Sequence, residues 1–139
     1  MSVQCSLVKG NPFQSFEEYV KNYRQQFGSW GEAVAAARIT DAGYELIGQN
    51  VRTPYGEIDL IARYGEVIVF FEVKTRSTDD FGPPEDALDT KKKEHLINAA
   101  SFFVQEKNIN GDWRVDLIAI RGRLGQADPE IEWFENVIG

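Results

Sequence analysis

Two acidic residues and a lysine lie in the most apolar part of this sequence. Asp59 falls inside the apolar run that follows Gly56, and Glu72 and Lys74 close the run that begins at Val67. Burying such charges is costly unless they are paired, so their presence here needs a reason. On a strand, Glu72 and Lys74 share one face and lie roughly 6.5–7 Å apart. The spacing therefore predicts an acid and a cation around one small space.

Asp59 joins this space only in certain pairings of the two strands. Directly opposed residues point to the same face, so only an odd sum of paired residue numbers brings Asp59 and Glu72 together. A two-residue turn at 64–65 would set them diagonally, and a four-residue loop at 64–67 would set them face to face. A three-residue loop at 64–66 would send Asp59 to the other face. Two of the three common loop lengths therefore build the site.

Two carboxylates at close range would repel each other unless a cation lies between them. Hard oxygen ligands with no histidine or cysteine nearby favour Mg²⁺, with Mn²⁺ as a substitute. Lys74 beside the metal could then orient or deprotonate a water and offset charge that develops on a phosphate. The alternative that the spacing leaves open is a plain ion pair between Glu72 and Lys74 at the exposed end of a strand.

Periodicity and turn residues divide the chain into helices and strands. Ser15-Phe16-Glu17-Glu18 predicts a capping box that opens a short helix at about 16–26, which Gly28 ends. Ser29-Trp30-Gly31-Glu32 repeats that signal before an alanine-rich helix at 32–42, which Gly43 ends. Strands are expected at 44–51, 57–63, 66–75 and 113–120, an edge strand at 131–134, and a helix at 85–105 with a break near Asp89. This order predicts an α/β fold with a mixed sheet.

Composition limits the class of protein. A chain of 139 residues with a single cysteine fits one domain in a reducing compartment, and no apolar run is long enough to span a membrane. We therefore expect a soluble, cytoplasmic protein with no membrane partner. The net charge of −7 argues mildly against nucleic acid, although four acidic residues fall in the tail at 126–139. Global charge does not decide the partner.

Several segments together resemble a known family of nucleases. "IDLIARYGEVIVFFEVKTR" resembles the PD-(D/E)XK signature, with Asp59 as the first acid and Glu72-Val73-Lys74 as the E-x-K. "GEIDLIA", "FFEVKTR", the upstream "GSWGEAVAAARITDAGYELIGQN" and the downstream "RVDLIAI" resemble the YraN-type family of predicted endonucleases, relatives of archaeal Holliday-junction resolvases. The likeness runs from about Gly28 to Ile120. Ile58 stands where the superfamily pattern has proline, which leaves the acid intact.

The resemblance implies a restriction endonuclease-like α-β-β-β-α-β core with a mixed sheet flanked by helices. The first 27 or so residues look longer than the usual start of this family, so we expect an extension at 1–27, partly disordered with a short helix, before a nuclease-like domain at 28–139. The implied function is a metal-dependent endonuclease that hydrolyses phosphodiester bonds in DNA, possibly branched or structured DNA. Enzymes that cut junctions often need two active sites, so the resemblance admits a homodimer. The alternatives are a catalytically idle module that binds nucleic acid or a protein partner and, more weakly, a hydrolase of small phosphorylated substrates.

The resemblance also assigns supporting residues. Glu32 matches the helix glutamate that many of these nucleases direct at the metal, although a capping box explains it equally well. Arg76, Arg52 and the run Lys91-Lys92-Lys93 are candidates for phosphate contacts, and the alternative for the lysine run is a solvated face. We expect Asp116 to pair with an arginine or the backbone, and His95 to be structural.

Overall fold

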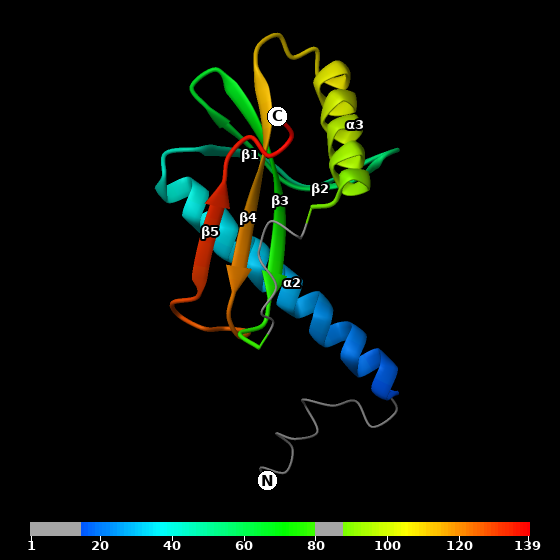
Figure 1. Cartoon of the computed structure of the whole chain (residues 1–139), viewed down its shortest axis with the longest axis vertical. Helices are drawn as coiled ribbons and strands as arrows, with labels where there is room; N and C mark the ends of the chain where they lie inside the picture. The colour runs from blue at the N-terminus through cyan, green and yellow to red at the C-terminus, as the bar shows by residue number, and fades with distance from the viewer. Residues whose placement is uncertain (1–14, 80–87) are drawn as a thin grey trace.

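The sheet has five strands in the order β1-β2-β3-β4-β5, with one helix on each face (Figure 1). The computed structural model describes residues 15–79 and 88–139. Its elements are α2 (Phe16–Asp41), β1 (Glu45–Thr53), β2 (Gly56–Tyr64), β3 (Val67–Arg76), α3 (Thr90–Glu106), β4 (Trp113–Arg121) and β5 (Glu130–Phe134). The predicted α/β fold with a mixed sheet and an α-β-β-β-α-β core is confirmed, with β5 as an added edge strand.

The faces of β3 place one core on each side of the sheet. Ile68 and Phe70 belong to the cluster beneath α3, whereas Val69 and Phe71 belong to the cluster beneath α2. This alternation is the period of two that a strand imposes. β3 and β4 run parallel, and α3 provides the crossover between them, while the other neighbouring strands are antiparallel. A parallel pair needs such a crossover, which explains why a helix interrupts the strands here.

One prediction about the helices is wrong. The two helices expected at 16–26 and 32–42 form a single helix, α2. Ser29 is therefore not an N-cap, and Gly28 does not end a helix. The predicted N-cap at Ser15 is confirmed, because its hydroxyl accepts from the Glu18 N–H at 3.0 Å. An interior glycine costs only about 1 kcal/mol relative to alanine, which continued helix can outweigh. Gly31 also has a packing reason, since a side chain there would overlap the Thr75 hydroxyl.

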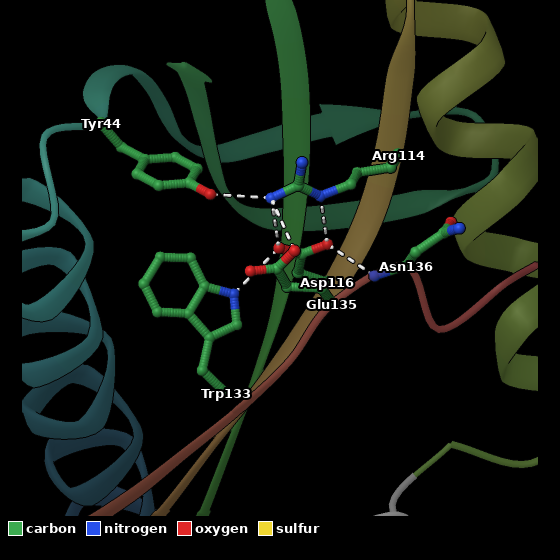
Figure 2. Close-up of polar contacts among 6 residues, drawn as sticks. All are labelled: Tyr44, Arg114, Asp116, Trp133, Glu135 and Asn136. Atoms are coloured by element: carbon green, nitrogen blue, oxygen red, sulfur yellow. Dashed lines mark hydrogen bonds and ion pairs between the residues drawn. The ribbon is translucent and has the colours of Figure 1, made fainter.

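A buried polar network fixes β5 and the C-terminal segment to β4 (Figure 2). Asp116 is fully buried and accepts hydrogen bonds from Arg114 Nε at 3.0 Å, from Trp133 Nε1 at 2.9 Å and from the Asn136 N–H at 2.9 Å. Arg114 also donates to the Tyr44 hydroxyl at 2.7 Å. The expectation that Asp116 pairs with an arginine and the backbone is confirmed.

Some predicted segments fall outside the described residues. These are residues 1–14 of the extension expected at 1–27 and the first residues of the helix expected at 85–105. The described part of that helix begins after Asp89, whose carboxylate accepts from the Lys92 N–H at 2.8 Å as an N-cap. Within the described ranges, neither helix is apolar enough over a sufficient length to cross a membrane.

Candidate active site

The site forms where β2 and β3 separate. Their pairing runs from Tyr64–Val67 to Leu60–Phe71, a register that sets Asp59 across from Glu72 if extended by one residue. This is the register expected of the four-residue loop at 64–67, with Tyr64 and Val67 closing as one further pair. Beyond Phe71 the backbone pairing stops, and Asp59 Oδ2 instead accepts the Val73 N–H at 2.8 Å. The Asp59 carboxylate thus accepts the hydrogen bond that a backbone carbonyl of β2 would accept in a continuous ladder, at the fork where the two strands separate.

An open cleft of about 430 Å³ surrounds this fork. Three elements other than β2 line it: the middle of α2, the second half of β3 and the first turn of α3. The lining residues are Arg24, Phe27, Gly28, Glu32, Asp59, Glu72, Val73, Lys74, Thr75 and Lys92. The structure thus brings four predicted site residues, Glu32, Asp59, Glu72 and Lys74, to one cleft, together with one of the three candidate lysines. Arg24 and Phe27 were not anticipated, because the sequence placed them in a separate extension.

The surroundings of Asp59 at the fork perturb its carboxyl group. The pKa of Asp59 is raised to about 8, first by burial and then by the charge of Glu72, against the lowering effect of the Val73 N–H. The two side chains also share a hydrogen bond that favours the protonated form of Asp59. Near neutral pH the pair therefore holds a proton when no further cation is present. This is the electrostatic behaviour expected of two acids that share one small space.

Glu32 lies at the wall of the same cleft. Burial raises its pKa, a hydrogen bond with Asn50 lowers it, and the charges of Glu57 and Glu72 raise it again. Asn50 adopts a left-handed conformation with φ of 48° at a position where the β1–β2 hairpin faces this glutamate. Glu32 is thus electrostatically linked to Glu72, but its capping role does not exist because α2 is continuous there.

Lys92 is the residue whose place the sequence reasoning missed. Its Nζ lies 3.1 Å from Glu72 Oε2, and only 11% of the Glu72 side chain is exposed. From the sequence, each of the three lysines has the same two alternatives, a phosphate contact or a place on a solvated face. Lys92 precedes the buried Leu96 by four residues, so helical spacing places it on the face of α3 that meets the sheet. That spacing was available in the sequence and could have singled Lys92 out.

The other predicted phosphate contacts lie elsewhere. Arg52 is 91% exposed on the β1–β2 hairpin and pairs loosely with Glu57 at 3.8 Å. Arg76 lies beside Arg121, Glu130 and Glu132 around a small pocket at the far end of β3. Lys91 is exposed and Lys93 is half-buried, and neither lines the cleft. The structure therefore brings none of these four cations to the Asp59 and Glu72 carboxylates.

A smaller hollow of about 260 Å³ lies on the other side of the carboxylate pair. It shares Asp59, Glu72 and Lys92 with the cleft and adds Tyr55 and His95. His95 is exposed at its rim. The carboxylate pair is therefore approachable from two sides.

The donor set suits a hard divalent cation only in part. Asp59 and Glu72 supply adjacent carboxylates whose mutual repulsion a cation would relieve. Within residues 15–79 and 88–139, however, no three acidic, histidine or cysteine side chains converge closely enough to form a metal cluster. A cation would thus be held by two carboxylates, with the remaining ligands from water or substrate, as Mg²⁺ commonly is.

The helix–three strands–helix–strand order and the mixed five-stranded sheet define an α/β protein with a restriction endonuclease-like core. The chain belongs to the uncharacterised protein family UPF0102, which matches residues 31–120. It is 41% identical over 98 residues to a UPF0102 protein of Moorella thermoacetica, covering 70% of this chain and 82% of that one. It is 38% identical over 122 residues to a UPF0102 protein of Desulfitobacterium hafniense strain Y51, covering 85% of this chain and all of the relative.

Proposed function

We propose that this protein is a divalent-metal-dependent endonuclease that hydrolyses phosphodiester bonds in DNA. The observation that carries the proposal is the Asp59–Glu72 carboxylate pair at the fork of β2 and β3, inside a cleft that Lys74 also lines. Structural carboxylates are ordinarily paired with cations or kept at the surface. A largely buried carboxyl group whose pKa is raised by burial and by a neighbouring acid is typical of a functional site.

In this proposal Asp59 and Glu72 hold Mg²⁺ or Mn²⁺, with Glu32 as a further support through water. When bound, the cation supplies Lewis-acid stabilisation of charge that develops on the phosphate. Lys74 holds the attacking water or offsets the developing negative charge beside it. Asp59 must lose its proton before it can serve as a ligand, so its raised pKa makes metal binding dependent on pH.

The cleft also gathers three cationic side chains beside its three acidic ones, which supports a polyanionic substrate. Arg24 from α2, Lys74 from β3 and Lys92 from α3 all line it, although the chain as a whole has a net charge of −7. Cations gathered at a site attract phosphates despite an acidic total. The preference for branched or structured DNA rests on the resemblance to junction resolvases alone.

One observation favours a second function, a catalytically idle module that binds nucleic acid or a protein partner. Lys92 already lies 3.1 Å from Glu72 and offsets its charge without a metal. If that ion pair is the resting arrangement in solution, the carboxylates need no divalent cation. The two functions differ in whether metal binds and whether DNA is cut.

The test is cleavage of linear, flapped and four-way DNA with Mg²⁺ or Mn²⁺, and with EDTA as the blank. Lys74→Met should lower the rate by about 10²-fold or more, in line with loss of a positioned acid–base or electrostatic group. Lys91→Met is the matched control, since Lys91 is exposed and lies outside the cleft. Equal cleavage by wild type, Lys74→Met and Asp59→Asn would assign the activity to a contaminant or to another part of the chain. DNA that is bound but never cut would favour the idle module.

A further inference from the structure

Residues 16–30 of α2 carry an apolar seam that the rest of the described chain covers only in part: Phe16 and Tyr23 are exposed, whereas Trp30 packs against the core beneath α2. The buried residues of α2 are Gly31, Ala35 and Ile39, all in its second half. Figure 1 shows the preceding turns projecting away from the sheet. On them, Phe16 is 78% exposed and Tyr23 is 46% exposed.

The spacing of this seam is that of a two-helix interface. Apolar residues recur at alternating intervals of four and three, namely Phe16, Val20, Tyr23, Phe27 and Trp30. A period of 3.5 residues keeps a seam facing one neighbouring helix over several turns. The rings also stack along the helix, Tyr23 on Phe27 at 6.2 Å and Phe27 on Trp30 at 5.8 Å between centroids. The seam is therefore a continuous row.

The projecting turns have little stability of their own. Isolated helices of this length are marginal in water, and most helical stability in proteins comes from packing of an apolar face. Gly28 weakens this segment further, and a side chain there would meet no atom within 4 Å in the chain. A partner that packs along the seam would supply the missing stabilisation.

We propose that this partner is a second copy of the chain, paired through the same segment with the two helices antiparallel. Glu17 and Arg24 lie one heptad apart on the same edge of the seam. A two-fold axis across the seam sets like edges together, so Glu17 of each copy faces Arg24 of the other. Neither residue has an ion-pair partner among the described residues. A parallel arrangement would not bring these two charges together.

This pairing places the second copy at the mouth of the candidate active site. Arg24 and Phe27 line the cleft, and antiparallel pairing sets the start of the partner helix beside Phe27. Each cleft is then bordered by both copies, and the dimer carries two clefts in a fixed relation. The expectation that this arrangement of two clefts suits paired cuts in DNA rests on the proposed endonuclease function. The proposed dimer itself does not depend on that function.

Sedimentation velocity of the full chain over a range of concentrations tests the pairing without any activity assay. Wild type should form dimers, and Tyr23→Lys should weaken the dimer by tenfold or more. Leu124→Lys, at an exposed apolar residue between β4 and β5, should leave it unchanged. Circular dichroism checks that the variants remain folded. Wild type that stays monomeric at every concentration would overturn the proposal. If Tyr23→Lys then weakened binding of single-stranded DNA, the seam would be a nucleic-acid surface and not a dimer interface.

Charge reversal tests the antiparallel arrangement. Glu17→Arg and Arg24→Glu should each weaken the homodimer, because each places like charges opposite one another. An equimolar mixture of the two variants should recover wild-type dimerisation, since each reversed charge then faces an opposite charge on the other chain. A mixture no better than the separate variants would contradict the antiparallel pairing, and it would do so whether or not the protein cuts DNA.

Discussion

Lys92 Nζ of α3 lies 3.1 Å from Glu72 Oε2 of β3, so the first turn of this helix contacts one of the two acids at the fork. This ammonium lies beside the carboxylates that are proposed to hold a divalent cation. Because like charges at one site repel, Lys92 and the metal should compete for Glu72.

Lys92→Gln should therefore tighten Mn²⁺ binding, by roughly three- to tenfold if the competing interaction is worth about 1 kcal/mol, as is typical of a partly exposed ion pair. Titration calorimetry measures the change. Lys91→Gln, one residue earlier in the same lysine run but exposed, is the matched control and should leave the affinity as it is. Weaker Mn²⁺ binding by Lys92→Gln would show that Lys92 supports the site instead of competing with the metal.

The raised pKa of Asp59 should make stability depend on pH. The ordinary pKa is 3.8 and the folded value is about 8, so between these values the folded protein binds more protons than the unfolded chain. The free energy of unfolding should then fall as pH rises through this window. Urea unfolding at a series of pH values measures the slope, and Asp59→Asn should reduce it. A wild-type stability that rises from pH 5 to pH 8 would contradict the assignment.

Gly31 and Gly28 lie in the same helix but should respond oppositely to alanine. A side chain at Gly31 would overlap Thr75 on β3, so Gly31→Ala should destabilise the fold by about 1–3 kcal/mol. At Gly28 nothing lies within 4 Å, so Gly28→Ala should stabilise the helix by about 0.5–1 kcal/mol. Chemical denaturation of both variants provides the comparison. Equal effects would mean that α2 does not approach β3 closely at Gly31.

The buried Asp116 network should be far more important for stability than a surface pair. Arg114→Met leaves the fully buried Asp116 without its main cation, which should cost about 3–5 kcal/mol. Arg63→Met breaks the exposed pair with Glu45 and should cost about 1 kcal/mol or less. Urea midpoints distinguish the two. If Arg114→Met is as mild as Arg63→Met, the network does not hold β5 and the C-terminal segment to β4.

Much of the fold could be predicted because each element has its own local signal. Alternation and apolar runs located β1 to β5 within a few residues, and the Ser15 capping box located the start of α2. The continuity of α2 could not be predicted, because Gly28 and Ser29 imitate a helix end while the packing that keeps Gly31 helical comes from Thr75, far along the chain.

The site was less predictable than the fold. An odd sum of paired residue numbers places Asp59 and Glu72 on one face of the hairpin, but two of the three common loop lengths give such a sum. Only the structure shows that the turn is Gly65-Glu66. The separation of β2 from β3 at Asp59 has no local signal, since it depends on a carboxylate replacing a backbone acceptor. Lys92 had a signal in its spacing from Leu96, but the choice among three lysines depends on how α3 is placed.

The central claim is that Asp59 and Glu72 together hold a divalent cation, and Mn²⁺ titration calorimetry above pH 8 tests it most directly. At that pH Asp59 should be ionised, because its pKa is about 8. Wild type should bind Mn²⁺, and Asp59→Asn should abolish binding while the protein stays folded by circular dichroism. Glu45→Gln, an exposed acid on the neighbouring strand, should bind Mn²⁺ as wild type does. Absence of Mn²⁺ binding by wild type, or equal binding by Asp59→Asn, would contradict the account.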